Sequence, residues 1–176
     1  MMKKIIAVLI VAVFALSTAA LAATYTDRDH DLTFEYDDAL FEIGMDDETD
    51  DELLVILDGK DPAWGETTYV KLYLADLRDG EKFPTVEDFA EMTEATGDEV
   101  TQGEWNGYKD VIMYSYTVDG FTESVFIVPV YDHDEPEVED ILTVSIGTSA
   151  VEDEAAAMAR DDAISAVLDS LKLIDD

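Results

Sequence analysis

The two histidines of this 176-residue chain stand in the same setting, each between two aspartates. Imidazole nitrogen and carboxylate oxygen together bind zinc, copper or manganese. If the two triplets meet in space, they form one metal site; otherwise each lies in a solvated acidic loop, and both interpretations stay open. The candidate ligands are Asp29, His30, Asp31, Asp132, His133 and Asp134.

Calcium binding is a second kind of chemistry that the acidic segments suggest. Asp27, Asp29 and Asp31 have the first spacings of a calcium-binding loop, but Leu32 stands where that loop needs glycine for its sharp turn. We therefore expect a strand to begin at Leu32. Looser calcium binding by the acidic runs 46–52 and 132–140 remains an alternative.

Nucleophilic catalysis has no support in the sequence. The chain has no cysteine and no G-x-S-x-G motif, so we expect no enzyme and no resident cofactor beyond a divalent cation. A hydrolase built on a carboxylate pair is the third functional interpretation, because the chain is rich in acids. Its pair would have a raised pKa and lie in a cleft.

Trp64 lies in the polar turn KDPAWGE, residues 60–66. Such a tryptophan either contacts a partner or a glycan, or folds back over the rim of the sheet. Trp64 is therefore the candidate partner-binding residue. Trp105 precedes Asn106-Gly107, and we expect it to pack on the sheet beside that turn.

The charge of the chain limits its partners. It has 10 Lys and Arg against 43 Asp and Glu, a formal net charge of −33. Nucleic acids and anionic lipid surfaces are polyanions, so they are unfavourable partners, whereas cationic proteins and divalent cations are favoured. Solubility or a salty habitat would also explain the acidity.

The first 22 residues predict a secretory signal peptide. Lys3 and Lys4 precede the apolar run 5–16, and Ala20-Leu21-Ala22 provides small residues before a cleavage after Ala22. A membrane anchor is the alternative. With no cysteine there is no lipoprotein anchor, and no second apolar span follows. We expect one exported domain over residues 23–176, periplasmic or secreted, with no membrane span and a net charge of −35 once two lysines are removed.

Alternating apolar residues predict a sheet of about six to eight strands. Asn106-Gly107 and Asp119-Gly120 are two-residue hairpin turns, because these residues accept the positive φ of a type I′ turn. The acidic run 46–52 predicts a solvated turn. The expected strands cover residues 32–36, 41–45, 53–59, 67–76, 99–105, 108–118, 121–131 and 141–147.

Two helices complete the expected α+β fold, an antiparallel sheet with both helices packed on it. The first covers part of 84–97, with Thr85 as its N-cap, Phe89 and Met92 on one face and Gly97 at its end. The second is long and C-terminal, begins with a capping box of Ser149 and Glu152, and ends near Lys172. Its expected apolar face is Met158, Ile164, Val167, Leu168 and Leu171.

The order of these elements resembles the PsbP/Mog-like fold family over roughly residues 31–174. The stretches that carry the likeness are LTFEYDDALFEI, FPTVEDFAE, EWNGYKDVIMYSYTVDG and AISAVLDSLKLI. The family's frequent Pro and Trp after the first strand are replaced here by residues 37–41, DDALF. The resemblance implies a compact α+β module that acts by binding, and it carries over no catalytic residue. We therefore expect an exported, non-catalytic binding or accessory protein, with divalent-cation binding as the alternative.

Overall fold

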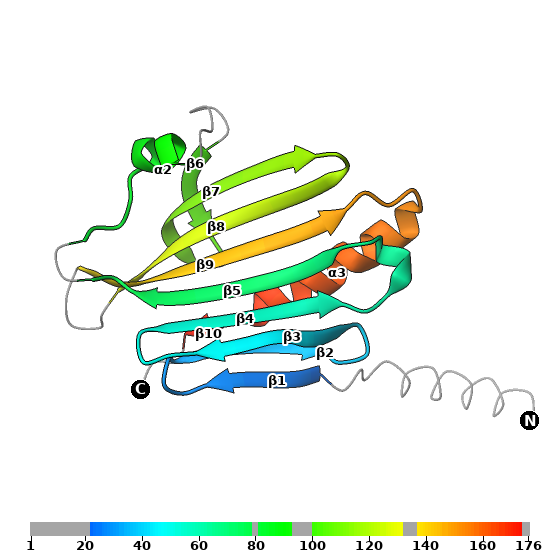
Figure 1. Ribbon diagram of the computed structural model, residues 1–176, viewed down its shortest axis with the longest axis horizontal. Coiled ribbons are helices and arrows are strands. Elements are labelled where there is room, and N and C mark those ends of the chain that lie inside the picture. The colour runs from blue at the N-terminus through cyan, green and yellow to red at the C-terminus, as the bar shows by residue number, and fades with distance from the viewer. Residues whose placement is uncertain (1–21, 79–80, 93–99, 132–136, 174–176) are drawn as a thin grey trace, which may run out of the picture.

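The computed structural model describes residues 22–78, 81–92, 100–131 and 137–173. These residues form ten strands in two antiparallel sheets, with two α-helices and one short 3₁₀ turn (Figure 1). In spatial order the large sheet is β3 (Phe41–Glu48), β4 (Glu52–Gly59), β5 (Thr68–Asp76), β9 (Val138–Ser149), β8 (Phe121–Tyr131), β7 (Tyr108–Val118) and β6 (Val100–Trp105). The small sheet is β1 (Ala22–Asp27), β2 (Leu32–Asp37) and β10 (Lys172–Leu173). The helical elements are η1 (Pro62–Trp64), α2 (Val86–Met92) and α3 (Glu154–Ser170).

The α+β class and the long C-terminal helix are confirmed, but the sheet is larger than expected and is divided in two. Strands β1 and β10 account for most of the difference. β1 reads AATYTD, which has no apolar alternation, and it is held by pairing with β2. β10 has only two residues, which pair with Thr33 and Leu32. Neither segment carries a local pattern that predicts a strand.

The main core lies between one face of the large sheet and a layer made of α3 and β2. Alternate residues of the central strands face it, as the period of two requires. From the other side Phe34 of β2, and Ile164 and Val167 of α3, pack against them. Each fully buried Leu, Ile or Val side chain contributes about 1.5–3 kcal/mol relative to an exposed one, so this layer holds the two sheets together. The sheet residues buried there include Leu53, Val55, Leu57, Val70, Leu72, Leu74, Leu142 and Val144.

The predicted hairpin turns are confirmed. Asn106 and Gly107 have φ of 50° and 86°, and Asp119 and Gly120 have φ of 51° and 80°. Positive φ at both central residues defines a type I′ turn, whose twist matches that of the paired strands. Trp105 stacks on Phe126 with a centroid distance of 4.7 Å, so it packs on the sheet beside its turn as expected.

The acidic run 46–52 is only partly a turn. β3 continues to Glu48, and the turn is confined to residues 49–51. A bulge between Ile43 and Met45 shifts the register of β3 on β4. The acids of β3 therefore stand on a paired strand, in defined positions, rather than in a loop.

The expected capping box of Ser149 and Glu152 at the start of α3 is wrong. Asp153 is the N-cap, and its Oδ1 accepts hydrogen bonds from the backbone N–H of Ala155 at 2.9 Å and Ala156 at 3.4 Å. Ser149 instead ends β9, where its Oγ accepts from the Thr67 N–H. Aspartate is as good an N-cap as serine, and β9 runs further than its apolar pattern suggested.

The expected apolar face of α3 is confirmed at Ile164, Val167 and Leu168, and Leu171, directly after the helix, is also buried in the core. It is wrong at Met158, whose side chain is 61% exposed. Arg160 is buried instead, and its Nη1 donates to the Ser149 carbonyl at 2.8 Å, which ties the helix to the end of β9. Lys172 is in β10 and not in the last turn of the helix. Long polar side chains bury their stems, so composition alone does not define the buried face.

The N-cap of α2 is as predicted. Thr85 Oγ1 accepts from the Asp88 N–H, and Asp88 Oδ2 accepts from the Thr85 N–H, which is a reciprocal capping box. Residues 93–97 of the expected helix lie outside the described residues, as does the predicted signal peptide up to residue 21. Among the described residues, no helix has the length and apolarity needed to span a membrane.

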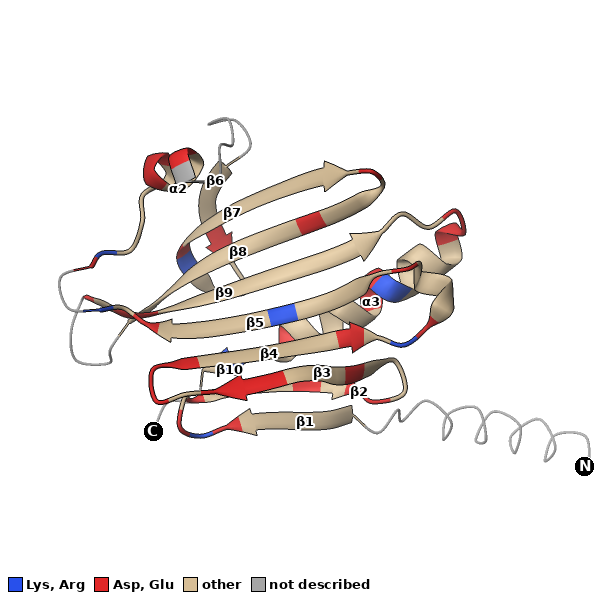
Figure 2. Cartoon of the chain, in the orientation of Figure 1, with Lys and Arg blue, Asp and Glu red and all other residues tan. Residues whose placement is uncertain are grey.

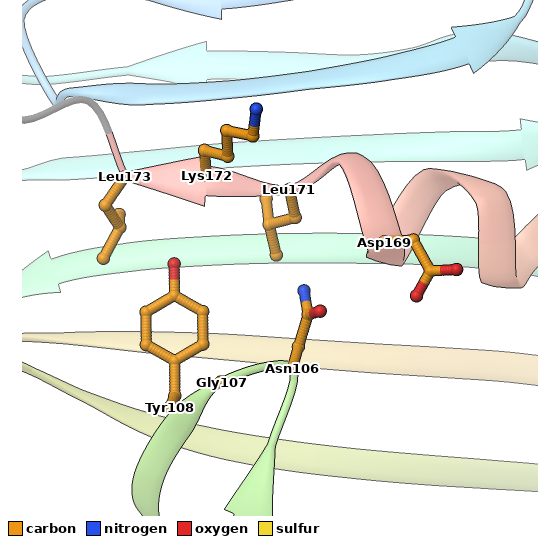
Figure 3. A pocket seen from close by; sticks show the side chains of 7 residues that line it. All are labelled: Asn106, Gly107, Tyr108, Asp169, Leu171, Lys172 and Leu173. Carbon is orange, nitrogen blue, oxygen red and sulfur yellow. The ribbon is translucent and has the colours of Figure 1, made fainter.

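The β6–β7 turn also contacts the C-terminal end of α3. Asn106 Nδ2 donates to the Leu168 carbonyl at 2.7 Å, and Figure 3 shows the asparagine pointing toward the segment that follows the helix. The Leu168 carbonyl also accepts from the backbone N–H of Leu171 at 3.2 Å, so the asparagine amide is a second donor to it, from 62 residues away in sequence. The hairpin tip is therefore a cap for α3.

We predict that Asn106→Gly lowers the free energy of unfolding by about 1 kcal/mol, because glycine keeps the turn but removes this hydrogen bond. Asp119→Gly is the matched control, since Asp119 holds the same turn position and no hydrogen bond is described for its side chain. Urea unfolding of both variants provides the measurement. Equal losses in the two variants would show that the Asn106 contact contributes nothing.

Candidate metal site

The turn between β1 and β2 is organised by one carboxylate. Asp27 Oδ1 accepts hydrogen bonds from the backbone N–H of Asp29 and of His30, each at 2.9 Å. Asp31 closes the turn with φ of 50°, a conformation that aspartate tolerates better than most residues. Asp27 is 8% exposed, so a buried carboxylate determines where His30 lies.

His30 is the central residue of the site. Its Nδ1 lies 3.3 Å from Asp27 Oδ1, and its side chain is only 6% exposed. Its other ring nitrogen, Nε2, is buried and has no hydrogen-bond partner within the described residues. Leaving a buried polar atom unpaired costs about 1–3 kcal/mol, so this nitrogen calls for a partner such as an ordered water or a bound ion.

Glu48 brings a second carboxylate to this histidine from β3 of the large sheet. One ligand atom each from Asp27, His30 and Glu48 lie within 4.8 Å of one another. Atoms bound tetrahedrally to one zinc ion at 2.0–2.2 Å stand about 3.4 Å apart. Glu48 is exposed, so its side chain is free to approach the other two groups.

The surroundings of the cluster are acidic. Asp76 and Asp140 are direct cross-strand partners on β5 and β9. Burial, the charges of Asp76 and Glu139 and a hydrogen bond to Asp76 raise the pKa of the Asp140 carboxyl to about 6, and nearby His30 lowers that pKa slightly. Figure 2 shows acidic residues at the β1–β2 and β3–β4 turns and where β5 ends, all at one end of the molecule. A cation is favoured there over any anion.

The structure rearranges the ligand set that the sequence suggested. His30 stays a candidate, but its neighbours are Asp27 and Glu48; Asp29 and Asp31 are exposed and outside the cluster. No spacing in the sequence links Glu48 to His30, since they meet only because β1 lies beside β3. Tyr25 OH donates to Asp46 Oδ1 at 2.9 Å and holds these strands together.

The second triplet, Asp132, His133 and Asp134, lies outside the described residues. The residues that flank its loop are described: Tyr131 pairs with Val138, at the same end of the molecule as the β1–β2 turn (Figure 1). Asp140 lies two residues further along β9, and His30 is close enough to lower the pKa of the Asp140 carboxyl.

Trp64, the candidate partner-binding residue, is buried with 2% of its surface exposed. Its ring packs against Phe41 with a centroid distance of 5.5 Å. Asp61 caps the 3₁₀ turn by accepting from the Ala63 N–H, which directs the tryptophan inward. The prediction of an exposed anchor is therefore wrong, and the alternative of packing over the sheet is confirmed.

A hollow lies between the β6–β7 turn and the end of α3 (Figure 3). It is lined by Asn106, Tyr108, Asp169, Leu171 and Lys172, among others. The Asn106 amide is already used on Leu168, and the hollow has one acid and one base. These groups serve the contact between hairpin and helix, so the histidine cluster is the better candidate site.

Comparison with known proteins gives this chain no relatives to reason from. No family model matches it, and no curated protein or solved structure matches it.

We predict that Asp140→Asn stabilises the protein at pH 7.5 by an amount on the order of 1 kcal/mol, measured by urea unfolding in the presence of a chelator. The folded chain holds the Asp140 proton more tightly than the unfolded chain. The stability that this group contributes is therefore present near pH 4 and is lost as the pH rises through about 6. Asparagine stays neutral throughout, so the difference should vanish near pH 4.

Asp162→Asn, an exposed position on α3, makes the same change in charge and is the control. If both variants gain equally at every pH, general charge repulsion rather than the Asp76–Asp140 pair explains the effect.

Proposed function

We propose that this chain is an exported, non-catalytic binding protein of the cell envelope or extracellular space, and that it binds a divalent cation between Asp27, His30 and Glu48. The observation that carries the proposal is the position of His30. One of its ring nitrogens lies within 4.8 Å of carboxylate oxygens of Asp27 and Glu48, and its buried Nε2 has no hydrogen-bond partner among the described residues. Export is supported by the signal-peptide pattern of residues 1–22. The strongly acidic composition supports a cationic ligand.

The donor set favours zinc or manganese over calcium. Calcium takes six to eight oxygen ligands, and an imidazole nitrogen is not among its usual ligands. Zinc binds histidine nitrogen and carboxylate oxygen in four-coordinate sites, and manganese accepts the same donors. Asp27 also fixes the position of the imidazole through its hydrogen bonds to the turn, which is the support that a metal-binding histidine needs.

The cation would join the two sheets. Asp27 and His30 belong to the β1–β2 hairpin of the small sheet, and Glu48 belongs to β3 of the large sheet. A bound ion would therefore hold the edge of one sheet against the edge of the other, in addition to the Tyr25–Asp46 hydrogen bond. Binding to the folded state alone stabilises that state by mass action.

The non-catalytic interpretation is supported by the acidic pair. A glycosidase needs two carboxyl groups about 5–9.5 Å apart across a substrate. Asp76 and Asp140 are hydrogen-bonded to each other and leave no room for a sugar between them. Membership of the PsbP/Mog-like family is part of the proposal, supported by the order of strands, capped short helix, Asn-Gly hairpin and closing helix.

We predict that zinc or manganese raises the melting temperature of chelator-treated protein by much more than calcium does at matched ionic strength. A free ion at a hundredfold its dissociation constant adds about 2.7 kcal/mol of stability. Glu48→Gln should abolish most of this shift, because it removes one carboxylate ligand. Glu48 is exposed, so its replacement leaves the core intact. His30→Ala should abolish it as well.

Asp50→Asn is the matched control, since Asp50 is an exposed carboxylate that lines a hollow together with His30 and Glu48 but lies outside the ligand cluster. It should keep the full shift. Equal small shifts with zinc, manganese and calcium, unchanged in Glu48→Gln, would mean that cations only screen the negative surface and would exclude the site.

A further inference from the structure

The face of the large sheet that points away from α3 is almost free of charge. Every charged residue of β5, β7, β8 and β9 except Lys71 lies within the first or last three residues of its strand. These residues are Asp76, Lys109, Asp110, Glu123, Glu139 and Asp140. The chain has 43 acids, and those of the described residues stand mainly at turns, at strand ends, on β3 and on the helices (Figure 2). A surface from which carboxylates are kept away in so acidic a protein has a different role from the rest of the surface.

Aromatic rings occupy this face in place of charges. Tyr69 on β5 lies 6.3 Å from Phe121 on β8, between ring centroids. On β7, Tyr114 and Tyr116 are stacked with centroids 6.0 Å apart and planes within 17°. Among the described residues, α2 covers one end of the face, where the Phe89 and Tyr114 ring centroids are 5.2 Å apart. We call the residues Tyr69, Tyr114, Tyr116, Phe121 and Glu123 the aromatic face.

Glu123 fixes the two central rings. Its Oε1 accepts from Tyr69 OH at 2.8 Å, and its Oε2 accepts from Tyr116 OH. The hydrogen bond to Glu123 raises the pKa of Tyr116 to about 12, so this phenol remains a donor at any physiological pH. The three residues form one row across β5, β8 and β7, with only Gly147 of β9 between them.

Gly147 gives the row its shape. A Cβ at this position would collide with the rings of Tyr69 and Phe121, so no other residue fits without moving them. The Tyr69 ring therefore lies over the backbone of β9 and reaches Glu123 across it. Tyr116 is 41% exposed and Val118 beside it 58%, so the row is open to solvent on its β7 side.

We propose that the aromatic face binds an uncharged polysaccharide. A sugar ring has an apolar C–H surface that packs on aromatic rings, and hydroxyl groups at its edge that bond to phenols and to a carboxylate. The overall negative charge repels nucleic acid, anionic lipid and a second copy of this chain. A cationic protein would be drawn to the acidic turns at the end of the sheet, and not to a face with one acid and one base. This site is separate from the cation site and does not depend on it.

The test is co-sedimentation of the purified protein with cellulose and chitin, and affinity electrophoresis in gels that contain soluble neutral glucans. We expect binding to at least one neutral polysaccharide and none to alginate, which is anionic. Tyr116→Ala should weaken binding about tenfold, as expected for the loss of one stacking ring. Tyr116→Phe keeps the ring and should retain most of the affinity.

Met158→Ala is the matched control, because Met158 is a large exposed side chain on α3, behind the sheet (Figure 1). It should bind as the parent does, and thermal melts should show that all three variants are folded. The proposal is overturned by failure to bind every neutral polysaccharide tested, by equal binding of parent and Tyr116→Ala, or by equal losses in Tyr116→Ala and Tyr116→Phe. It is also overturned if Tyr116→Ala abolishes a dimer seen by light scattering, since the face would then bind a second copy.

Discussion

The excess of carboxylates over cationic side chains is the constraint on which the rest of this structure depends. With 43 acids and 10 Lys and Arg, few carboxylates can form an ion pair. Tyrosine hydroxyls supply donors instead: Tyr25 bonds to Asp46, and both Tyr69 and Tyr116 bond to Glu123. These bonds keep carboxylates in defined positions without a compensating charge, at about 1.5–3 kcal/mol each when the acceptor is ionised. Charge repulsion places most other acids at turns and strand ends, where water screens them.

The same constraint explains both proposed sites. Acids concentrated at one end of the molecule surround His30, whose unpaired nitrogen and two carboxylate neighbours suit a cation. On the face of the large sheet that points away from α3, the Glu123 carboxylate is already bonded to two tyrosines, and the aromatic rings around it suit a ligand without charge. The two proposals therefore place a cation and a neutral ligand on different regions of one surface. The two regions lie on different parts of the fold, so each can be tested in a variant that leaves the other intact.

The C-terminal helix joins these parts into one structure. Arg160 ties its beginning to the end of β9, Asn106 caps its end, and Ser170 Oγ accepts from the Glu35 N–H of β2. The helix thus contacts both the large and the small sheet while its apolar face covers the core. Because β2 is held in this way, the β1–β2 turn and His30 keep a fixed position relative to β3. The geometry of the cation site therefore depends on contacts made far from it.

The sequence by itself determined the local features: the periods of most strands, the two type I′ turns, the Thr85 cap and the α+β class. These depend on side chains within a few residues of one another, and their physical signals are local. Only the tertiary structure decided that Glu48 meets Asp27 and His30, that Trp64 is buried, and that Arg160 rather than Met158 faces inward. It also decided that β1 and β10 form a second sheet. Each of these depends on which strand lies beside which, and that is set by burial of the whole core rather than by any short pattern.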